Sequence, residues 1–405
     1  MQTRIHPLDT SAAGVPHAVT SLHFGASSSP GGRCALLQCS LHADEIPPML
    51  VGWHLRQRLQ VLEAAGQLTG EVVLLPACNP IGLAQQVWGR LQGRFDLASG
   101  QNFNRHYPAL AEGAAKRFEA GGGRLGADPQ ANALALRAAL QTELAALPAA
   151  GPLQQLRHTL MRLALDADIV LDLHCDNEAV LHVYATPEHE QTALQLTHCL
   201  NAPLLLLAAE SGDGPFDEAQ SGIWPQLRAR LGAGVPLAGF AATVELRGET
   251  EVDHALAAAD AQGLLRFLQQ QGFVRELAEA EAEAKLEPLL QTQTSQREAL
   301  LQTHTQTHTQ TPQQDCAVRP LAGCLHLLAP FSGVLVWRLA LGQQVQAGQP
   351  LADLVCPVSG RCEILPSPVD GLFFARELQR WARAGQSVAK IAGQEARRSG
   401  KLLSA

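Results

Sequence analysis

Residues 33–41 read Arg-Cys-Ala-Leu-Leu-Gln-Cys-Ser-Leu, a short apolar run that directly follows two glycines. A second apolar run, Glu-Val-Val-Leu-Leu-Pro, occupies residues 71–76. The intervening residues 46–65 have the length and apolar spacing of a helix, whose first turn tolerates the proline pair near its start. Strand, helix and strand in this order predict a βαβ unit of a mostly parallel sheet.

Further apolar runs extend this pattern along the chain. Residues 168–174 and 241–246 are predicted to be buried strands, and residues 181–185 and 203–208 are shorter strand candidates. Residues 1–290 are therefore predicted to form one α/β domain, in which helices flank a mixed sheet. Stretches of helical pattern separate the strands, at residues 131–147, 152–166, 188–199 and 252–288.

The composition changes abruptly after residue 290. Residues 291–316 are rich in glutamine and threonine and contain His304 and His308. Such a polar segment cannot bury enough apolar surface to fold, so it is predicted to be a flexible linker. The two histidines are weak metal-ligand candidates, because no partner ligands accompany them in the sequence.

Past the linker, residues 317–395 repeat a pattern of short strands and glycine turns. Ser-Gly-Val-Leu-Val at 332–336 is echoed by Asp-Gly-Leu-Phe-Phe at 370–374. Ala-Gly-Gln-Pro-Leu at 347–351 is echoed by Ala-Gly-Gln-Ser-Val at 384–388. Two such half-repeats predict a small all-β barrel-sandwich with pseudo-twofold symmetry.

This β-domain resembles biotinyl- and lipoyl-type domains, whose modified lysine lies on the hairpin between the two halves. The corresponding hairpin, residues 356–363, reads Cys-Pro-Val-Ser-Gly-Arg-Cys-Glu, and no lysine occurs between residues 318 and 389. The domain therefore lacks a modifiable lysine, and we expect it to pack, cap or assemble.

The composition of the chain excludes several function classes. The formal charge of −8 comes without a basic run, and aromatic residues make up only 4% of the 405 residues, so nucleic acid and anionic membrane surfaces are not expected partners. Apolar stretches of membrane-spanning length and a signal-peptide core are missing from the sequence. Nine cysteines without a CxxC pair predict reduced thiols and a cytoplasmic location.

The first chemical motif is His42-Ala-Asp-Glu45, which comes directly after the first predicted strand. Residues three apart lie on one face of a turn, so the His42 imidazole and the Glu45 carboxylate can converge on one metal ion. The spacing is common by chance. The alternative is a solvated helix start with an acidic first turn.

The second motif is Asp172-Leu-His174, at the end of an apolar strand. In open α/β sheets functional groups collect at the carboxyl ends of strands, although a histidine there can also be a hydrogen-bonded core residue. Together with His42 and Glu45, His174 completes the three protein ligands of a catalytic zinc and leaves one position for water. Asp172 lies two residues before His174, on the same strand face, and could orient it.

The third motif, Thr-Val-Glu-Leu-Arg-Gly at 243–248, places Glu245 inside an otherwise apolar strand. A carboxylate in such a strand is costly unless it has a partner or a task, and beside a metal-bound water it can accept and return a proton. The alternative is a structural pair with Arg247. That pair needs both side chains on the face of the site, so Arg247 is also a candidate substrate-binding residue.

The fourth motif, Gln-Asn-Phe-Asn-Arg-His-Tyr-Pro at 101–108, offers the Asn104 amide and the Arg105 guanidinium. This pair is suited to a substrate carboxylate. A further arginine, Arg94 or else Arg90, could polarise the scissile carbonyl and stabilise an oxyanion. Arginines in loops are also common as solvated surface residues.

The motifs follow one another in a specific order: HxxE, NPxG, an arginine, NxNR, a strand ending in DLH and a strand carrying VELRG. In this order they resemble the zinc carboxypeptidase superfamily, and within it they are most similar to the succinylglutamate desuccinylase/aspartoacylase group of amidohydrolases. The resemblance covers roughly residues 30–250 and implies a phosphorylase/hydrolase-like α/β fold. Family members with a C-terminal lipoyl-like β-domain fit the second half of the chain.

The resemblance also assigns roles to individual residues. It implies one Zn²⁺ per chain on His42, Glu45 and His174, with Glu245 as the general acid/base. It implies that Arg94, with Arg90 as the second candidate, polarises the carbonyl, and that the substrate carboxylate binds Asn104 and Arg105. This sequence departs from the family pattern at Ala43, where a glycine is usual, and in a long segment between Arg94 and Asn104.

These residues predict a zinc-dependent deacylase that hydrolyses the amide bond of an N-acyl amino acid or a similar small amide. A metallocarboxypeptidase acting on short peptides is an alternative, because Glu-Leu-Arg at 245–247 resembles the peptidase branch. A non-catalytic binding or assembly protein is a second alternative. The expected partner is a small molecule bearing a carboxylate. Residues 205–225 are predicted to form a specificity loop. The oligomeric state stays open, and a homo-oligomer is one possibility.

Overall fold

The computed structural model describes residues 1–8, 16–25, 32–275 and 315–403. The predicted linker, with His304 and His308, lies almost entirely outside the described residues. The helix expected over 252–288 is shorter than predicted: it ends at Gln270, and residues 271–275 turn back so that Val274 forms a bridge with Leu68, while 276–288 lie outside the described residues. Among the described helices, none has both the length and the apolar character needed to cross a membrane. The domain boundaries drawn from the sequence stay predictions.

Within the described residues, nine strands form one mixed sheet in the order β1-β2-β4-β3-β7-β11-β9-β10-β12. The central strands β4, β3, β7 and β11 run parallel to one another, whereas β2 pairs antiparallel with β4 and β9 pairs antiparallel with β11. The bounds are Gln2–Leu8 (β1), His17–Phe24 (β2), Cys34–Cys39 (β3), Glu71–Leu75 (β4), Ile169–Asp176 (β7), His182–Ala185 (β9), Leu204–Leu207 (β10), Phe240–Gly248 (β11) and Ala317–Pro320 (β12).

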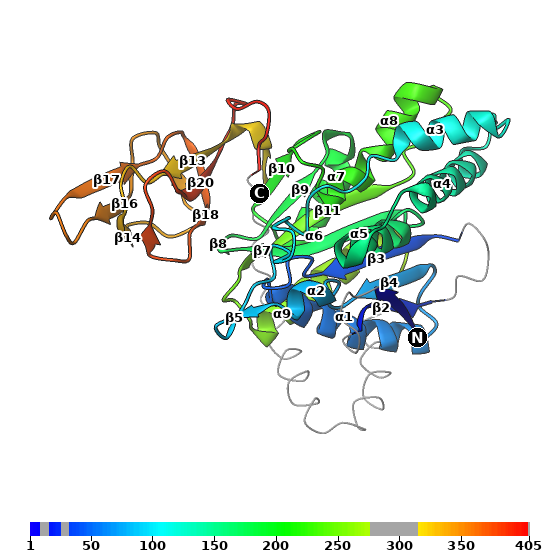
Figure 1. The fold of residues 1–405 in the computed structure, drawn as a ribbon, viewed down its shortest axis with the longest axis horizontal. Helices are drawn as coiled ribbons and strands as arrows, with labels where there is room; N and C mark the ends of the chain where they lie inside the picture. Colours follow the sequence, from blue (N-terminus) through cyan, green and yellow to red (C-terminus); the bar gives the residue numbers. More distant parts are fainter. Residues whose placement is uncertain (9–15, 26–31, 276–314, 404–405) are drawn as a thin grey trace, which may run out of the picture.

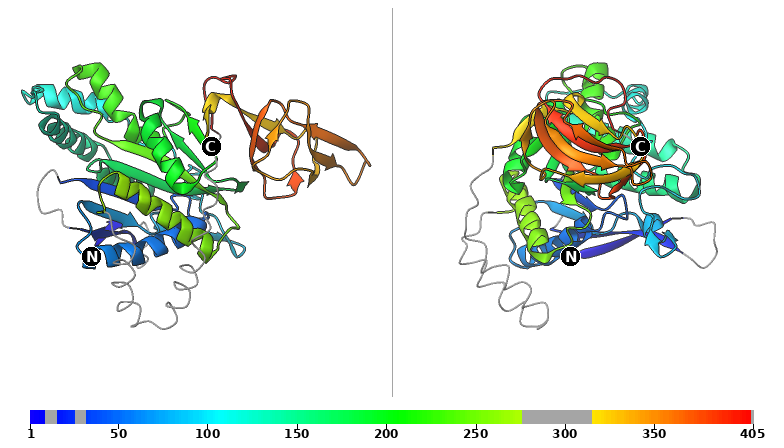
Figure 2. Two further views of the ribbon diagram at one scale, coloured as in Figure 1. Left: turned by 180° about the vertical axis from the view of Figure 1, so that it is seen from behind. Right: turned by 90° about the vertical axis from the view of Figure 1, so that its left-hand side faces the viewer.

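Both faces of this sheet are covered, which explains the uninterrupted apolar runs in the sequence. Leu36 and Leu37 are adjacent in β3, and they lie in two different buried clusters on opposite faces. Helices α1, α6 and α9 supply the cluster that contains Leu37, and α3, α4, α5 and α8 supply the other (Figures 1 and 2). Their bounds are Pro47–Ala64 (α1), Ala111–Ala120 (α3), Pro129–Ala146 (α4), Gly151–Ala164 (α5), Glu190–Leu200 (α6), Ile223–Leu231 (α8) and His254–Gln270 (α9).

The elements predicted from apolar periodicity are present, whereas other elements were not predicted. Strand β1 is largely exposed, so its sequence carries no apolar run. It pairs with β2 along its whole length at the edge of the sheet. Strand β12 follows the linker in sequence but pairs with β10 in the main sheet. Such edge pairing depends on neighbours in space and leaves little trace in local sequence.

The C-terminal part consists of two small sheets, in the orders β13-β20-β18-β15 and β17-β16-β14-β19. The two half-repeats are divided between the sheets, because β14 and its counterpart β18 lie in different sheets, as do β16 and β20. Leu335, Leu354, Phe373 and Ile391 from the four strands meet in one core. The bounds are Cys324–Leu328 (β13), Gly333–Trp337 (β14), Gln344–Val345 (β15), Pro350–Val355 (β16), Cys362–Pro366 (β17), Gly371–Arg376 (β18), Trp381–Ala382 (β19) and Ser387–Gly393 (β20).

The C-terminal part is joined to the main sheet through the continuation of β7. Strand β8 (Glu178–Ala179) follows β7 directly and pairs antiparallel with β18. The Glu178 carboxylate accepts hydrogen bonds from Arg376 Nε and Arg380 Nη2, at 2.5 and 2.6 Å. The strand that carries His174 therefore ends against the C-terminal part (Figure 1).

The central strand β3 provides a test of the packing. Leu37→Ala is expected to lower the free energy of unfolding by about 3 kcal/mol, because it leaves a cavity in a core where Leu37 is fully buried. Urea denaturation measures this difference. The control Leu134→Ala, on an exposed part of α4, is expected to change the free energy of unfolding by less than about 1 kcal/mol. Equal losses in the two variants would contradict this account of the core.

Candidate active site

A sharp turn after β3 brings the first motif over the carboxyl end of the sheet. Ser40 has a left-handed backbone (φ 58°), which turns the chain out of the strand. Its hydroxyl donates to the Glu45 carbonyl at 2.6 Å, and its N–H donates to the Leu173 carbonyl of β7 at 3.1 Å. The segment 42–45 is thereby fixed beside the end of β7, where His174 lies.

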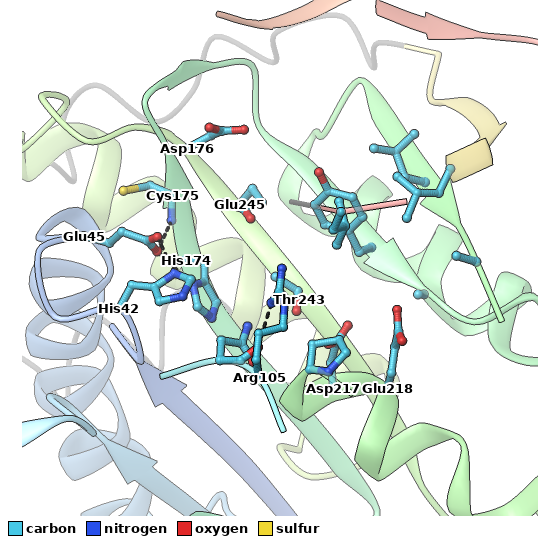
Figure 3. Close-up of a pocket in the computed structure, with 18 of the residues that line it drawn as sticks. His42, Glu45, Arg105, His174, Cys175, Asp176, Asp217, Glu218, Thr243 and Glu245 are labelled. Carbon is cyan, nitrogen blue, oxygen red and sulfur yellow. Dashed lines mark hydrogen bonds and ion pairs between the residues drawn. The ribbon is translucent and has the colours of Figure 1, made fainter. Parts of the chain in front are cut away.

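His42, Glu45 and His174 form a buried cluster at this edge (Figure 3). The Glu45 carboxylate lies between the two imidazoles, with Oε1 2.7 Å from His42 Nδ1 and Oε2 2.8 Å from His174 Nδ1. One potential ligand atom from each side chain lies within 4.8 Å of the others. Two imidazole nitrogens and one carboxylate oxygen are a donor set that suits Zn²⁺.

The outer nitrogen of each histidine is held by another side chain. His42 Nε2 lies 2.8 Å from Asn102 Oδ1, and His174 Nε2 lies 2.9 Å from Asp172 Oδ2. Both contacts leave Nδ1 of the imidazole directed at the cluster, which is how metal-binding histidines are oriented. The structure therefore places Asp172 beside His174 as expected, whereas Asn102 lay in the 101–108 motif without being singled out.

The electrostatics of the cluster favour a cation. Burial alone would raise the pKa of Glu45, but the two imidazoles hold it well below its usual range. Burial, assisted by Arg94, lowers the pKa of His42. Burial would also lower the pKa of His174, but Asp172 and Glu45 raise it well above the usual range. Two carboxylates thus stabilise a positive charge at this position, which a metal ion would also supply.

Glu245 lies beside this cluster on β11, directly opposite His174 of β7 in the sheet register. It lines the same pocket as the cluster, and among the described residues its Oε2 has no hydrogen-bond partner (Figure 3). Burial, with Glu45 as the next cause, raises the pKa of Glu245 to about 8. A carboxyl group of this kind can exchange a proton near neutral pH.

Arg247 does not line the pocket that holds the cluster, so the geometry does not support its predicted role in binding substrate. The pairing of β11 with β7 shifts between Glu245 and Gly248, and Arg247 has a left-handed backbone (φ 66°). Strand alternation is broken there, so residues 245 and 247 do not share a face. The Arg247 guanidinium instead pairs with the buried carboxylate of Asp260 in α9.

Arg94 is the arginine that reaches the cluster. Its Nη1 lies 3.2 Å from Glu45 Oε1 and 3.3 Å from His42 Nδ1. Arg90 lies in the short hairpin of β5 (Gln86–Val87) and β6 (Arg90–Leu91), is exposed and does not line the pocket. The geometry therefore favours Arg94 over Arg90.

The departure at Ala43 is accommodated by close glycine contacts. Ala43 is fully buried, and its N–H donates to the Gly93 carbonyl at 3.0 Å. A side chain at Gly93 would lie within 2.1 Å of the Asp44 backbone nitrogen, so only glycine fits there. This contact fixes the backbone next to Arg94. The methyl group of Ala43 lies against Gly82, where an added Cβ would be only 2.8 Å from it, so the absence of a side chain at Gly82 leaves room for the methyl group.

Asn104 and Arg105 are buried and line the pocket. Asn104 Oδ1 accepts a hydrogen bond from the Phe216 N–H at 2.8 Å, and Arg105 Nη1 donates to the Asn104 carbonyl at 2.6 Å. Phe216 begins helix α7 (Phe216–Ser221), which falls in the predicted specificity segment 205–225. That segment reaches the pocket through Pro215, Asp217 and Glu218.

The two acids of α7 were not predicted. Burial raises the pKa of Asp217 to about 6, with the Asp172 carboxylate as the next cause, and raises the pKa of Glu218 to about 7, with the Asp217 carboxylate as the next cause. Their sequence, Phe-Asp-Glu, resembles any acidic first turn of a helix. Only the packing of α7 against β11 reveals that these side chains face the pocket.

The C-terminal part contributes the remaining wall. Leu321, His326, Lys390 and Leu403 line the pocket, and the Lys390 ammonium pairs with Asp176, two residues after His174. No local motif marks these four residues, and the position of Lys390 in the first half-repeat is occupied by Asp353. The prediction that the C-terminal part packs or caps is consistent with this placement.

The mixed α/β sheet, with helices on both faces, further strands at the C-terminal end and a buried His-Glu-His cluster at its edge, has the predicted fold of succinylglutamate desuccinylase/aspartoacylase structures. Residues 31–125 match the family model described as the succinylglutamate desuccinylase/aspartoacylase catalytic domain, which confirms the resemblance found in the motifs. A search of curated proteins finds no match to this sequence.

Solved structures share the fold over almost the whole chain. A succinylglutamate desuccinylase/aspartoacylase family protein from Shewanella amazonensis SB2B is 22% identical, with a TM-score of 0.77 over 97% of this chain and 98% of its own. A second from Shewanella frigidimarina is 20% identical, with a TM-score of 0.74 over 97% of each chain. The ectoine utilization protein EutE (DoeB) from Ruegeria pomeroyi is 15% identical, with a TM-score of 0.62 over 96% of this chain and 94% of its own. At these identities the likeness establishes the fold.

Proposed function

We propose that this protein is a zinc-dependent amidohydrolase that removes the acyl group from an N-acyl amino acid or a similar small amide. The observation that carries the proposal is the buried His42–Glu45–His174 cluster with the Glu245 carboxylate beside it. The match of residues 31–125 to a desuccinylase/aspartoacylase domain supports this class of reaction.

The zinc ion would be held by His42, Glu45 and His174, and when bound it would polarise the amide carbonyl and make its water more acidic. Glu245 removes a proton from the attacking water and returns it to the departing amine. Arg94 donates to the oxygen that becomes negatively charged during attack. Asn104 and Arg105 bind the substrate carboxylate, which orients the amide towards Glu245.

The main alternative is a metallocarboxypeptidase, which would use the same residues. A peptidase needs an exposed groove, whereas this pocket has a wall of residues from the C-terminal part. Arg247, which suggested the peptidase branch, is paired with Asp260 outside the pocket. These two observations favour a small substrate. The alternative of a non-catalytic binding protein has less support, because Glu245 lines the same pocket as the His42–Glu45–His174 cluster, which is the arrangement that the proposed hydrolysis requires.

The function is tested by metal analysis and an assay of amine release. Purified protein is expected to contain about one zinc per chain, the occupancy of a single three-ligand site. It is expected to release amine from N-acyl amino acids and leave short peptides intact. Release from peptides alone would favour the carboxypeptidase. Failure to bind zinc after reconstitution would reject the metal site and favour a binding protein.

Arg105→Lys is expected to raise KM for a carboxylate-bearing amide about 10- to 100-fold, because a lysine cannot reproduce the two-pronged contact of a guanidinium. Steady-state kinetics with an acyl amino acid, and with the corresponding amide that lacks the carboxylate, measure this effect. The exposed Arg124 offers the matched control Arg124→Lys, which is expected to leave KM unchanged. A similar KM increase for both substrates would argue against carboxylate binding at Arg105.

A further inference from the structure

The last described residues of the chain form part of the pocket wall. Residues 398–403, here called the C-terminal strap, lie against the loop that precedes α7. The Leu402 N–H donates to the Ser211 carbonyl at 2.8 Å, and Leu403 N–H donates to the same carbonyl at 3.3 Å. Lys401 forms an ion pair with Asp213 in this loop. The strap is thus attached to the loop by backbone and side-chain contacts.

The strap is also held by hydrogen bonds of Arg398 and by the burial of Leu402. Arg398 donates to the Leu402 carbonyl at 2.7 Å and to the Cys324 carbonyl of β13 at 3.2 Å. Leu402 is buried in a cluster that also contains Leu206 of β10 and Leu321, and Leu403 packs against the same cluster. A segment with a buried leucine and several hydrogen bonds is an ordered part of the structure.

The loop under the strap is connected to the proposed carboxylate-binding residues. The His106 N–H donates to the Asp213 carbonyl at 2.7 Å, and the Tyr107 N–H donates to the Gly214 carbonyl at 3.0 Å. Gly212 adopts a left-handed backbone (φ 106°), and a Cβ added there would lie only 3.0 Å from the Lys401 side chain, so the loop packs closely against the strap at this glycine. The strap is therefore linked to the segment next to Arg105 indirectly: it contacts the loop that precedes α7, and this loop in turn contacts that segment.

The chemistry of the strap at the pocket is apolar. Leu403 lines the pocket together with Leu206 and Leu321, whereas the metal cluster, Glu245 and the arginines line its polar part. An apolar wall of this kind binds an aliphatic group and limits its length by steric contact.

We propose that Leu403 is a specificity-determining residue, at which the C-terminal strap limits the length of an aliphatic group on the substrate. The proposal rests on the proposed function and deepens it by naming the substrate class, a carboxylate-bearing amide with a short aliphatic group. Removal of the Leu403 side chain enlarges the pocket at its apolar wall and favours longer chains.

The test compares Leu403→Ala with the unmodified protein in two ligand series. One series is N-acylglycines from acetyl to octanoyl, and the other is N-acetyl amino acids with unbranched side chains of increasing length. Binding is measured by calorimetry on zinc-loaded protein in a Glu245→Gln background, so that the result does not depend on turnover. In one series Leu403→Ala is expected to shift the preference towards longer chains by about tenfold or more. The control is Leu328→Ala, an exposed leucine of β13.

An unchanged chain-length preference in both series would overturn the proposal, as would failure of every ligand to bind. Failure of the proposed function looks different. In that case the ligands would bind and Leu403→Ala would still shift the chain-length preference, but the unmodified protein would release no amine. A second variant, Lys401→Ala, tests the attachment of the strap by amide hydrogen exchange. Faster exchange at His106, Tyr107 and Leu402 is expected, and unchanged exchange at all three would show that the strap does not hold the loop.

Discussion

Glu245→Gln is expected to lower kcat at least about a thousandfold while the protein still binds one zinc per chain. Glutamine keeps the size and hydrogen-bonding shape of the side chain but can neither accept nor return the proton. The pKa of Glu245, raised to about 8 by burial and by Glu45, makes this carboxyl suited to proton exchange. Steady-state amine release and zinc analysis of the same preparation measure the two quantities together.

Glu249→Gln is the matched control for this variant. Glu249 lies just beyond the same strand, is half-buried and does not line the pocket, so its replacement is expected to change kcat less than about threefold. Glu245→Ala should reproduce the loss of turnover with zinc retained. If Glu245→Gln kept more than about a tenth of the activity, Glu245 would not be the general acid/base.

His174→Ala is expected to weaken zinc affinity about a hundredfold or more, because only two of the three proposed protein ligands remain. The loss of zinc affinity should exceed the effect of removing one hydrogen bond, because His174 also contacts both Glu45 and Asp172 inside the core. A competition assay with a zinc-binding dye measures affinity. Thermal denaturation with and without zinc should show stabilisation of the unmodified protein and little or none of His174→Ala.

His198→Asn provides the control for this experiment. His198 is exposed on α6 and is not among the residues of the cluster, so zinc affinity and the zinc-dependent shift in Tm are expected to stay unchanged. Asp172→Asn adds a further comparison, because it keeps all three ligands but removes the charge beside His174. Equal zinc affinity in His174→Ala and the unmodified protein would exclude His174 as a ligand.

The sequence determined the central fold because burial imposes a strong local pattern. Strands β3, β7 and β11 are covered on both faces, so each is apolar over most of its length, and helix α1 connects β3 to β4. The HxxE spacing and the histidine after an apolar strand also follow from local geometry. His42, Glu45 and His174 were therefore identified together, although the latter lies far along the chain.

Other parts of the site were decided only by tertiary structure. The backbone irregularity at Arg247 turns its side chain from the pocket towards Asp260, and no feature of Glu-Leu-Arg indicates that turn. Asn102 acquires its role because its amide oxygen meets His42, sixty positions away in sequence. Such contacts depend on the relative position of whole elements, and a single residue type does not encode them.

The C-terminal part illustrates the same division. Its repeated glycine-turn pattern predicted short strands, because turns and alternating burial leave local signals in a sequence. The contribution of Lys390 and Leu403 to the pocket had no such signal, since it arises from the docking of β18 onto β8 and of the strap onto the loop at Ser211. Local sequence determined the strands and the motifs of the proposed metal site, and tertiary packing determined which distant side chains complete the pocket around them.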